Sequence, residues 1–203
     1  MAIAKPFEAK DIFICNTSNI DSMRHGRPQT VLIEQGAQIY KNGAIVPLTM
    51  GTKEMTDPQL DHAYALPTAH TEITEVIGKF IIVDPEINVE QYRRIHNSLA
   101  AFGEKSLEVG THTAYELQLR DRIEYSQGYF AVANDEAQLA TIIVGDVLKI
   151  NNQGLLEKVG AAGTAGGCFK VVAKNEQRMP LMMDGLQGAL PKPYLMFKLE
   201  VIA

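Results

Sequence analysis

The chain has no tryptophan and only two cysteines among its 203 residues. Carbohydrate-binding surfaces favour tryptophan, whose large flat ring also carries a polar N–H, so its absence argues against a sugar-binding module. The two cysteines, Cys15 and Cys168, lie far apart and form no Cys-x-x-Cys motif. We therefore expect two free thiols, and neither a disulfide framework nor a cysteine-based zinc site.

A large charge of one sign and long apolar runs are also missing. With 19 basic and 24 acidic residues, the formal net charge of −5 gives no basic field for nucleic acid and no polybasic membrane anchor. The longest apolar runs are only a few residues, and the first residues, MAIAKPFEAKDIFICN, do not follow the pattern of a signal peptide. The content of 46% hydrophobic and 21% charged residues predicts a globular rather than a disordered protein. From the charge balance and the short apolar runs we expect binding to neither nucleic acid nor membrane.

Short apolar runs separated by turn residues are what the sequence does contain. They predict strands in the segments 11–15, 30–49, 72–86, 112–126, 128–133, 140–159, 167–174 and 194–203. The Lys41-Asn42-Gly43 sequence is typical of a tight hairpin turn, and Asp84-Pro85 should end the strand before it. Many short strands with turns between them favour a mainly β fold, a barrel or a sandwich.

One helix and one polar segment interrupt this pattern. Apolar residues recur at three- and four-residue steps over 88–102, which predicts an amphipathic helix with His96 on its apolar face. Residues 16–30, NTSNIDSMRHGRPQT, show no periodicity and few apolar side chains. We expect this run to be an extended arm that becomes ordered against a neighbouring subunit, with a plain surface loop as the alternative. The chain then divides into an N-terminal strand and arm, 1–30, and a β-rich body, 31–203.

The glycine-rich segment VGAAGTAGGCFKVVAK, 159–174, is the first candidate for chemistry. A phosphate-binding loop leads into a helix, whose N-terminus supplies aligned N–H donors. Here a β-branched, alternating segment follows, and the glycines do not have the G-x-G-x-x-G spacing. We expect a structural loop that lets two strands connect closely.

Other candidate groups do not converge on a recognisable site. The histidines lack the spacing of a zinc-binding helix, although Asp61, His62 and His70 leave open a loop metal site or a hydrolase. The segment 177–193 is rich in methionine and proline, which suits either a buried loop over a barrel end or an exposed contact loop. We expect no enzyme, no metal and no cofactor.

The charged segment LRDRIEY, 119–125, is better explained by sheet structure. It places Asp121 between Arg120 and Arg122, with Glu124 nearby. In one continuous strand Arg120, Arg122 and Glu124 share a face, which suits cross-strand ion pairs on a solvated sheet.

From about residue 76 to its end the chain resembles the head decoration proteins of tailed bacteriophages. The resemblance is carried by the strand-to-proline segment EVIGKFIIVDPE, by the alternation in HTAYELQLRDRIEYS, and by the closing segments GTAGGCFKVVAK and YLMFKLEVIA. Those proteins commonly have Gly-Asp before an isoleucine, where this chain has Arg120-Asp121-Arg122 before Ile123.

The resemblance implies a non-enzymatic virion protein that is made in the host cytoplasm, binds the outside of the capsid and stabilises it. Its partners would be the major capsid protein and further copies of itself on the capsid, with a trimer as one form. In the predicted arm, Arg24, His25 and Arg27 are candidates for capsid contact, because they can pair with carboxylates or backbone carbonyls. A phage tail or fibre component that binds a host surface is the alternative, and a hydrolase is a third.

Overall fold

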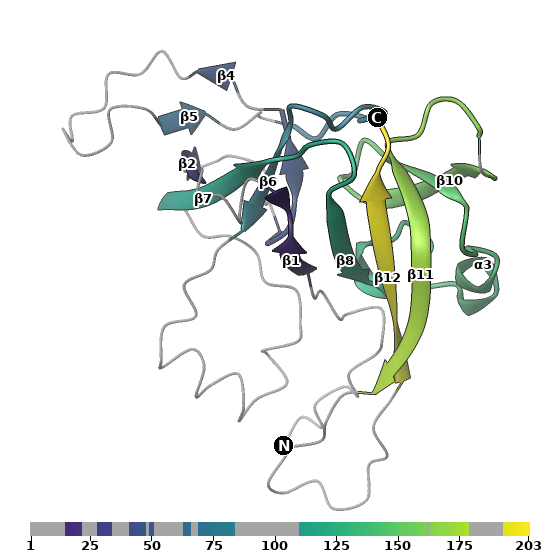
Figure 1. Cartoon of the computed structure of the whole chain (residues 1–203). Helices are drawn as coiled ribbons and strands as arrows, with labels where there is room; N and C mark the ends of the chain where they lie inside the picture. Colours follow the sequence, from purple (N-terminus) through teal and green to yellow (C-terminus); the bar gives the residue numbers. More distant parts are fainter. Residues whose placement is uncertain are drawn as a thin grey trace, which may run out of the picture.

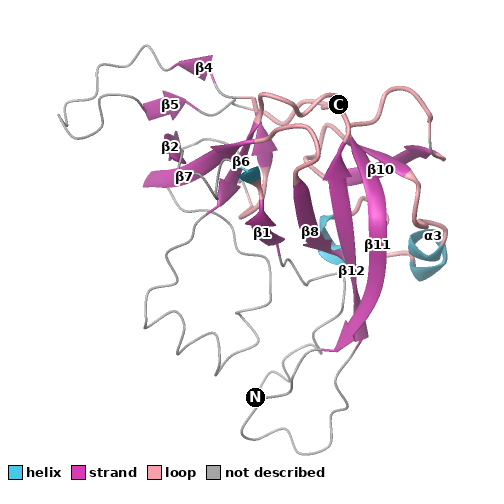
Figure 2. Ribbon diagram, in the orientation of Figure 1, coloured by secondary structure: helices cyan, strands magenta, loops and turns pink. Residues whose placement is uncertain are grey.

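Two six-stranded β-sheets form most of the described structure. The structure is a computed structural model that describes residues 15–21, 28–33, 41–47, 49–50, 63–65, 69–83, 110–161, 163–178 and 193–203. Figure 2 shows that strands dominate these parts, with short helical turns beside them. The prediction of a mainly β, sandwich-like fold is therefore confirmed. No helix among the described residues is long and apolar enough to cross a membrane.

The first sheet, sheet A, is antiparallel throughout and is built mostly from the C-terminal half of the chain. Its strands, in spatial order, are β1 (Cys15–Asn19), β8 (Arg122–Ser126), β12 (Pro193–Val201), β11 (Phe169–Arg178), β9 (Val147–Ile150) and β10 (Leu156–Gly160). The long pair β11 and β12 lies at its centre (Figure 1).

The second sheet, sheet B, contains strands from residues 28 to 116. In spatial order they are β3 (Ile45–Val46), β6 (Phe80–Val83), β7 (Gly110–Glu116), β2 (Pro28–Ile33), β5 (Ala63–Ala65) and β4 (Thr49–Met50). All neighbours are antiparallel except β2 and β5, which are parallel. Figure 1 shows β2, β4, β5 and β7 extending away from sheet A.

The hydrophobic core joins the two sheets. Phe197, Leu199 and Val201, alternate residues at the C-terminal end of β12, are fully buried, as the period of two in a strand predicts. Phe197 of β12 packs against Phe130, with their ring centroids 4.4 Å apart, and Ile45 and Ile81 of sheet B belong to the same buried cluster. The core therefore fixes β3 and β6 of sheet B against sheet A.

Sheet A has an approximate internal twofold symmetry that the sequence did not suggest. The strands β1, β8 and β12 correspond to β10, β9 and β11, because equivalent pairs recur in the same register: Ile123–Leu199 with Leu148–Phe169, and Cys15–Tyr125 with Leu156–Ile150. Both outer pairs, β1–β8 and β10–β9, also shift register after their second or third matched residues. The sequence shows no corresponding repeat, because the two halves share strand register and little residue identity.

Several strand boundaries differ from the prediction. Residues 16–19, expected in an arm, belong to β1 and pair with β8, and Ile20 beside them is fully buried. For residues 16–19 both the arm ordered by a neighbouring subunit and the plain surface loop are therefore wrong, because these residues pair within the chain. Strand β2 crosses residue 30, so the described sheets show no break between the predicted arm and body.

Other predicted strands are divided or replaced by turns. The segment 112–126 bends at 117–121 and passes from sheet B to sheet A. The segment 128–133 forms the 3-10 helix η3 (Gln127–Tyr129) and turns, and the short helix α3 (Glu136–Ala140) precedes β9. Asp135 caps α3 by accepting a hydrogen bond from the Gln138 N–H. The predicted helix over 88–102 and the segment 179–192 lie outside the described residues.

Candidate interaction surface

Three four-residue turns of the same build lie at the ends of strands: Val76–Lys79, Gln118–Asp121 and Ile143–Asp146. In each turn the N–H of the fourth residue donates to the carbonyl of the first, at 2.9, 3.1 and 3.1 Å. The third residue of each has a positive φ: Gly78 at 74°, Arg120 at 73° and Gly145 at 99°. Glycine suits this position because it lacks a Cβ, and Arg120 is the exception.

Each of these turns presents an aliphatic side chain to solvent at its second position. Ile77, Leu119 and Val144 are 41%, 57% and 59% exposed, and Ile143 beside Val144 is as exposed. A turn places this residue at its apex, where it cannot pack on the sheet behind it. The three turns therefore display apolar groups outside an otherwise well-buried core.

Two of the turns are neighbours. The N–H of Gly78 donates to the Leu117 carbonyl at 3.0 Å, and the N–H of Leu117 donates to the Lys79 carbonyl at 2.8 Å. Both turns also bond to the C-terminal residues, through Val76 to Ala203 at 2.8 Å and through Arg120 to Val201 at 3.0 Å. We name Ile77, Leu119 and Arg120 the apical surface.

A buried carboxylate holds the turn that carries Leu119. Asp121 is only 4% exposed. Its Oδ2 accepts a hydrogen bond from the N–H of Gln118 at 2.8 Å, and its Oδ1 accepts one from the N–H of Asp21 at 2.8 Å. One side chain thus closes the turn and fastens the end of β1 to it.

Asp146 holds the Val144 turn in the same way. It is 3% exposed, accepts a hydrogen bond from the N–H of Ile143 at 2.8 Å, and forms an ion pair with Lys158 at 2.7 Å. Lys174 donates to the carbonyls of Leu139 and Ile142 at 3.0 and 2.9 Å, so it fastens the end of α3 to sheet A. Burial lowers the pKa of the Lys174 ammonium, and the charge of Asp146 opposes that shift.

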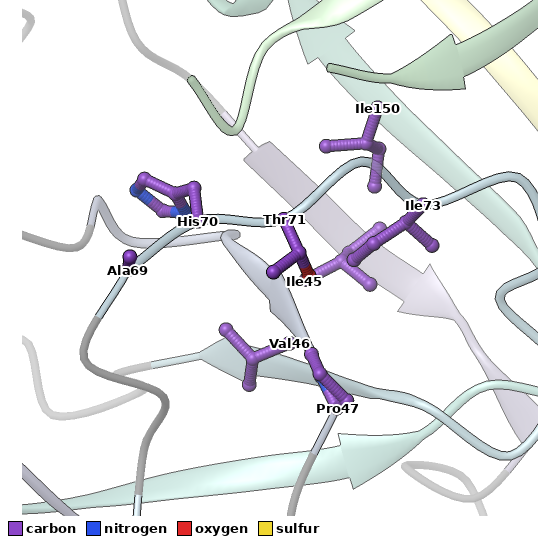
Figure 3. A pocket seen from close by; sticks show the side chains of 8 residues that line it. All are labelled: Ile45, Val46, Pro47, Ala69, His70, Thr71, Ile73 and Ile150. Carbon is purple, nitrogen blue, oxygen red and sulfur yellow. The ribbon is translucent and has the colours of Figure 1, made fainter. Parts of the chain in front are cut away.

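His70, a candidate from the sequence, lines a small hollow (Figure 3). The other lining residues, mostly apolar, are Ile45, Val46, Pro47, Ala69, Thr71, Ile73 and Ile150. The hollow has a volume of about 10 Å³, close to the least that holds one water molecule. The His70 ring lies against Gly154, where an added Cβ would be 2.8 Å from its Cε1. Asp61 and His62 lie outside the described residues, and no group of metal-ligating side chains gathers within the described ranges.

The Asn42-Gly43 turn closes over a cluster of one half-buried thiol and two buried phenols. The Tyr125 hydroxyl donates to the Gly43 carbonyl at 2.8 Å, and the Tyr129 hydroxyl donates to the Asn42 carbonyl. A Cβ on Gly43 would lie 2.7 Å from Cys15 Sγ. Burial raises the pKa values of the Cys15 thiol and the Tyr125 hydroxyl. The turn is confirmed, with Ala44 N–H donating to Lys41 at 2.9 Å, but residues 34–40, which would complete a hairpin, are not described.

The glycine-rich segment has the structural role that we expected. It connects β10 to β11, so a strand follows it. A Cβ on Gly167 would lie 2.0 Å from Cγ1 of Val147 and 3.0 Å from the Leu148 carbonyl oxygen, which leaves room only for glycine. This close approach lets β11 pair with β9.

The predicted ion pairs are partly confirmed. Arg122 pairs with Glu200 at 2.7 Å, and Glu124 pairs with Lys198 at 3.1 Å, both across β8 and β12. Arg120 does not share their face, because it lies in the turn before β8. Cys15 and Cys168 are free thiols, as expected.

The three residues proposed for capsid contact, Arg24, His25 and Arg27, lie outside the described residues. Sequence reasoning missed the apical surface. The signal available in the sequence is an aliphatic residue followed by glycine, in Ile77-Gly78 and Val144-Gly145. No family model, curated protein or solved structure matches this chain.

Proposed function

We propose that this chain is a structural protein of a tailed-phage virion that binds the outside of the capsid and stabilises it. The sequence resemblance from residue 76 onward supports this proposal, and so does the mainly β fold of two sheets. In this role the protein is made in the host cytoplasm, binds the major capsid protein and associates with further copies of itself on the shell. Its free thiols suit assembly in a reducing compartment.

The observation that carries the proposal is that two of the exposed aliphatic side chains lie on neighbouring hydrogen-bonded turns. Single exposed apolar residues are ordinary on protein surfaces, but Ile77 and Leu119 lie on adjoining turns. Their backbone is held by hydrogen bonds to the C-terminal residues and by the buried Asp121. A surface ordered before binding loses less conformational entropy on association, which favours contact with a protein.

The Arg120-Asp121 turn is the place where the sequence departs from the pattern of the decoration proteins. Decoration proteins commonly have Gly-Asp where this chain has Arg-Asp. The Arg120-Asp121 turn nevertheless has the same hydrogen bonds as the Gly145-Asp146 turn, including an aspartate that accepts from the first residue of the turn. The departure changes a side chain and preserves the backbone geometry.

Co-sedimentation tests the proposal directly. Purified chain is mixed with empty capsids of the phage whose genome encodes it, and the particles are pelleted through sucrose. We expect saturable binding, and decorated capsids that withstand higher temperature before they release their subunits. The same mixture with unassembled capsid protein is the control, since a decoration protein should prefer the assembled shell.

Two results would contradict the proposal. If the chain stays in the supernatant at every concentration and is missing from the mass spectrum of purified virions, it is not a capsid protein. If virions contain it but tailless capsids neither contain nor bind it, the tail or fibre alternative replaces the proposal.

A further inference from the structure

Arg120 adopts a backbone conformation that its side chain disfavours. Among the residues that the structure describes, Arg120 is the one non-glycine residue with a positive φ, at 73°. A Cβ is crowded there, and an arginine stays in this region only when the surrounding structure holds it. The two turns of the same build place Gly78 and Gly145 at the equivalent position. Glycine at this position is therefore compatible with the turn, and the presence of an arginine there requires another explanation.

The contacts of Arg120 within the chain do not supply that explanation. Its backbone N–H donates to Val201, a bond that any residue except proline would make, just as Gly145 donates to Val171. No ion pair joins its guanidinium to the residues that the structure describes, whereas Arg122, two positions later, pairs with Glu200. The Arg120 side chain is exposed and stands beside the exposed Leu119.

We propose that Arg120 is a recognition residue of the apical surface, and that its guanidinium binds a carboxylate on the capsid protein. Leu119 and Ile77 fill an apolar contact beside that carboxylate. This inference rests on the proposed capsid-binding function and names the partner's chemistry. An exposed cation flanked by aliphatic groups is complementary to an acidic side chain next to an apolar depression. A guanidinium binds such a carboxylate with two parallel hydrogen bonds, which fixes orientation as well as charge.

The test compares four variants of the full chain in the capsid co-sedimentation assay. Arg120→Gly removes the guanidinium and also the cost of the positive φ, because glycine adopts that conformation freely. Leu119→Ser removes the neighbouring apolar contact. Arg122→Gln is the control for charge, because it removes a cation two residues away. Val144→Ser is the control for apolar exposure, because it changes the equivalent position of the symmetry-related turn.

For Arg120→Gly we expect at least tenfold weaker binding to capsids, together with an unchanged or higher melting temperature of the free protein. Leu119→Ser should weaken binding to a similar degree. The two controls should stay within about twofold of the wild type. Binding of the wild type should also weaken as salt is raised, and binding of Arg120→Gly should depend less on salt.

Two results would overturn the inference while the proposed function stands: full binding by Arg120→Gly, or an equal loss in Arg122→Gln. A lower melting temperature for Arg120→Gly would show that the arginine serves the fold, which also overturns it. If wild-type chain does not bind capsids at all, the proposed function fails first and the inference falls with it.

Discussion

Two buried aspartates hold two of the three turns that carry exposed apolar side chains. Asp121 accepts from two backbone N–H groups, at 2.8 Å each, and joins β1 to the turn before β8. Asp146 has the same place in the symmetry-related turn but is also paired with Lys158. A buried acceptor of this kind is costly to remove, because the donors that it satisfied are left without a partner.

Replacing Asp121 by alanine should lower the free energy of unfolding by about 2 to 3 kcal/mol, since two hydrogen bonds to a charged group are lost. Chemical denaturation of the two proteins measures the difference. Asp135→Ala is the matched control, because Asp135 also accepts a backbone N–H, from Gln138, at a more exposed helix end. That change should cost about 1 kcal/mol. Equal losses for the two variants would mean that burial of Asp121 adds nothing.

The two thiols should make the free energy of unfolding depend on pH in the alkaline range. Burial raises the pKa of Cys168 from its ordinary value of 9.0 to about 12, and it raises the pKa of Cys15 as well. The unfolded chain loses these protons from about pH 9, while the folded chain keeps them. The stability that they contribute is therefore present below pH 9 and is lost as pH rises from 9 towards 12. Tyr125 and Tyr129, whose pKa values burial also raises, act in the same direction.

We expect the free energy of unfolding to fall between pH 9 and pH 11, more steeply in the wild type than in Cys168→Ala. Urea titrations at several pH values measure this slope. Because the comparison uses slopes, the stability lost by truncating the side chain does not affect it. Identical slopes in the two proteins would show that Cys168 ionises as freely in the folded chain as in the unfolded one.

At the scale of elements, the connection between β10 and β11 depends on two different properties of glycine. Gly167 provides space, because a Cβ there would lie 2.0 Å from Val147. Gly163 provides a conformation, because its φ is 86° although nothing lies within 4 Å of an added Cβ. The loop thus contains a steric requirement and a backbone requirement four residues apart.

Gly167→Ala should destabilise the protein by about 3 kcal/mol, at the upper end of what overpacking costs. Gly163→Ala should cost only about 1 kcal/mol, for the disfavoured φ. Adding Val147→Ala should recover part of the loss caused by Gly167→Ala and none of the loss caused by Gly163→Ala. Thermal unfolding of the single and double variants measures these terms. No coupling between positions 147 and 167 would contradict the close approach.

For the whole molecule, periodicity predicted the fold class and turn chemistry predicted many of its boundaries. The alternation along β12 and the β-branched residues of β11 identified the central strands of sheet A. The prediction of one strand over 112–126 was wrong, because the apolar alternation continues through Leu117 and Leu119 into the corner, where the backbone turns from one sheet to the other. The strand at Cys15–Asn19 was missed because its residues are polar, and pairing with β8 provides what side-chain periodicity does not indicate.

The candidate site was less predictable than the fold. Arginines in a polar run suggested a contact segment at 24–27, which lies outside the described residues. The apical surface depends on two turns, at 76–79 and 118–121, being brought together by the β6–β7 pairing and the C-terminal residues. The spacing of residues in the sequence does not indicate that these two turns lie next to each other. The exposure of Leu119 follows only from its place at the apex of a turn.

Image reconstruction of capsids with and without the added chain tests the central claim most directly. We predict extra density on the outer surface of the shell, at symmetry-related positions, in which the end of the molecule that carries the C-terminus and the apical surface faces the capsid. The same reconstruction with Arg120→Gly at the same concentration should show that density weakened or lost. Identical shells with and without the chain, or density confined to the tail, would contradict the account.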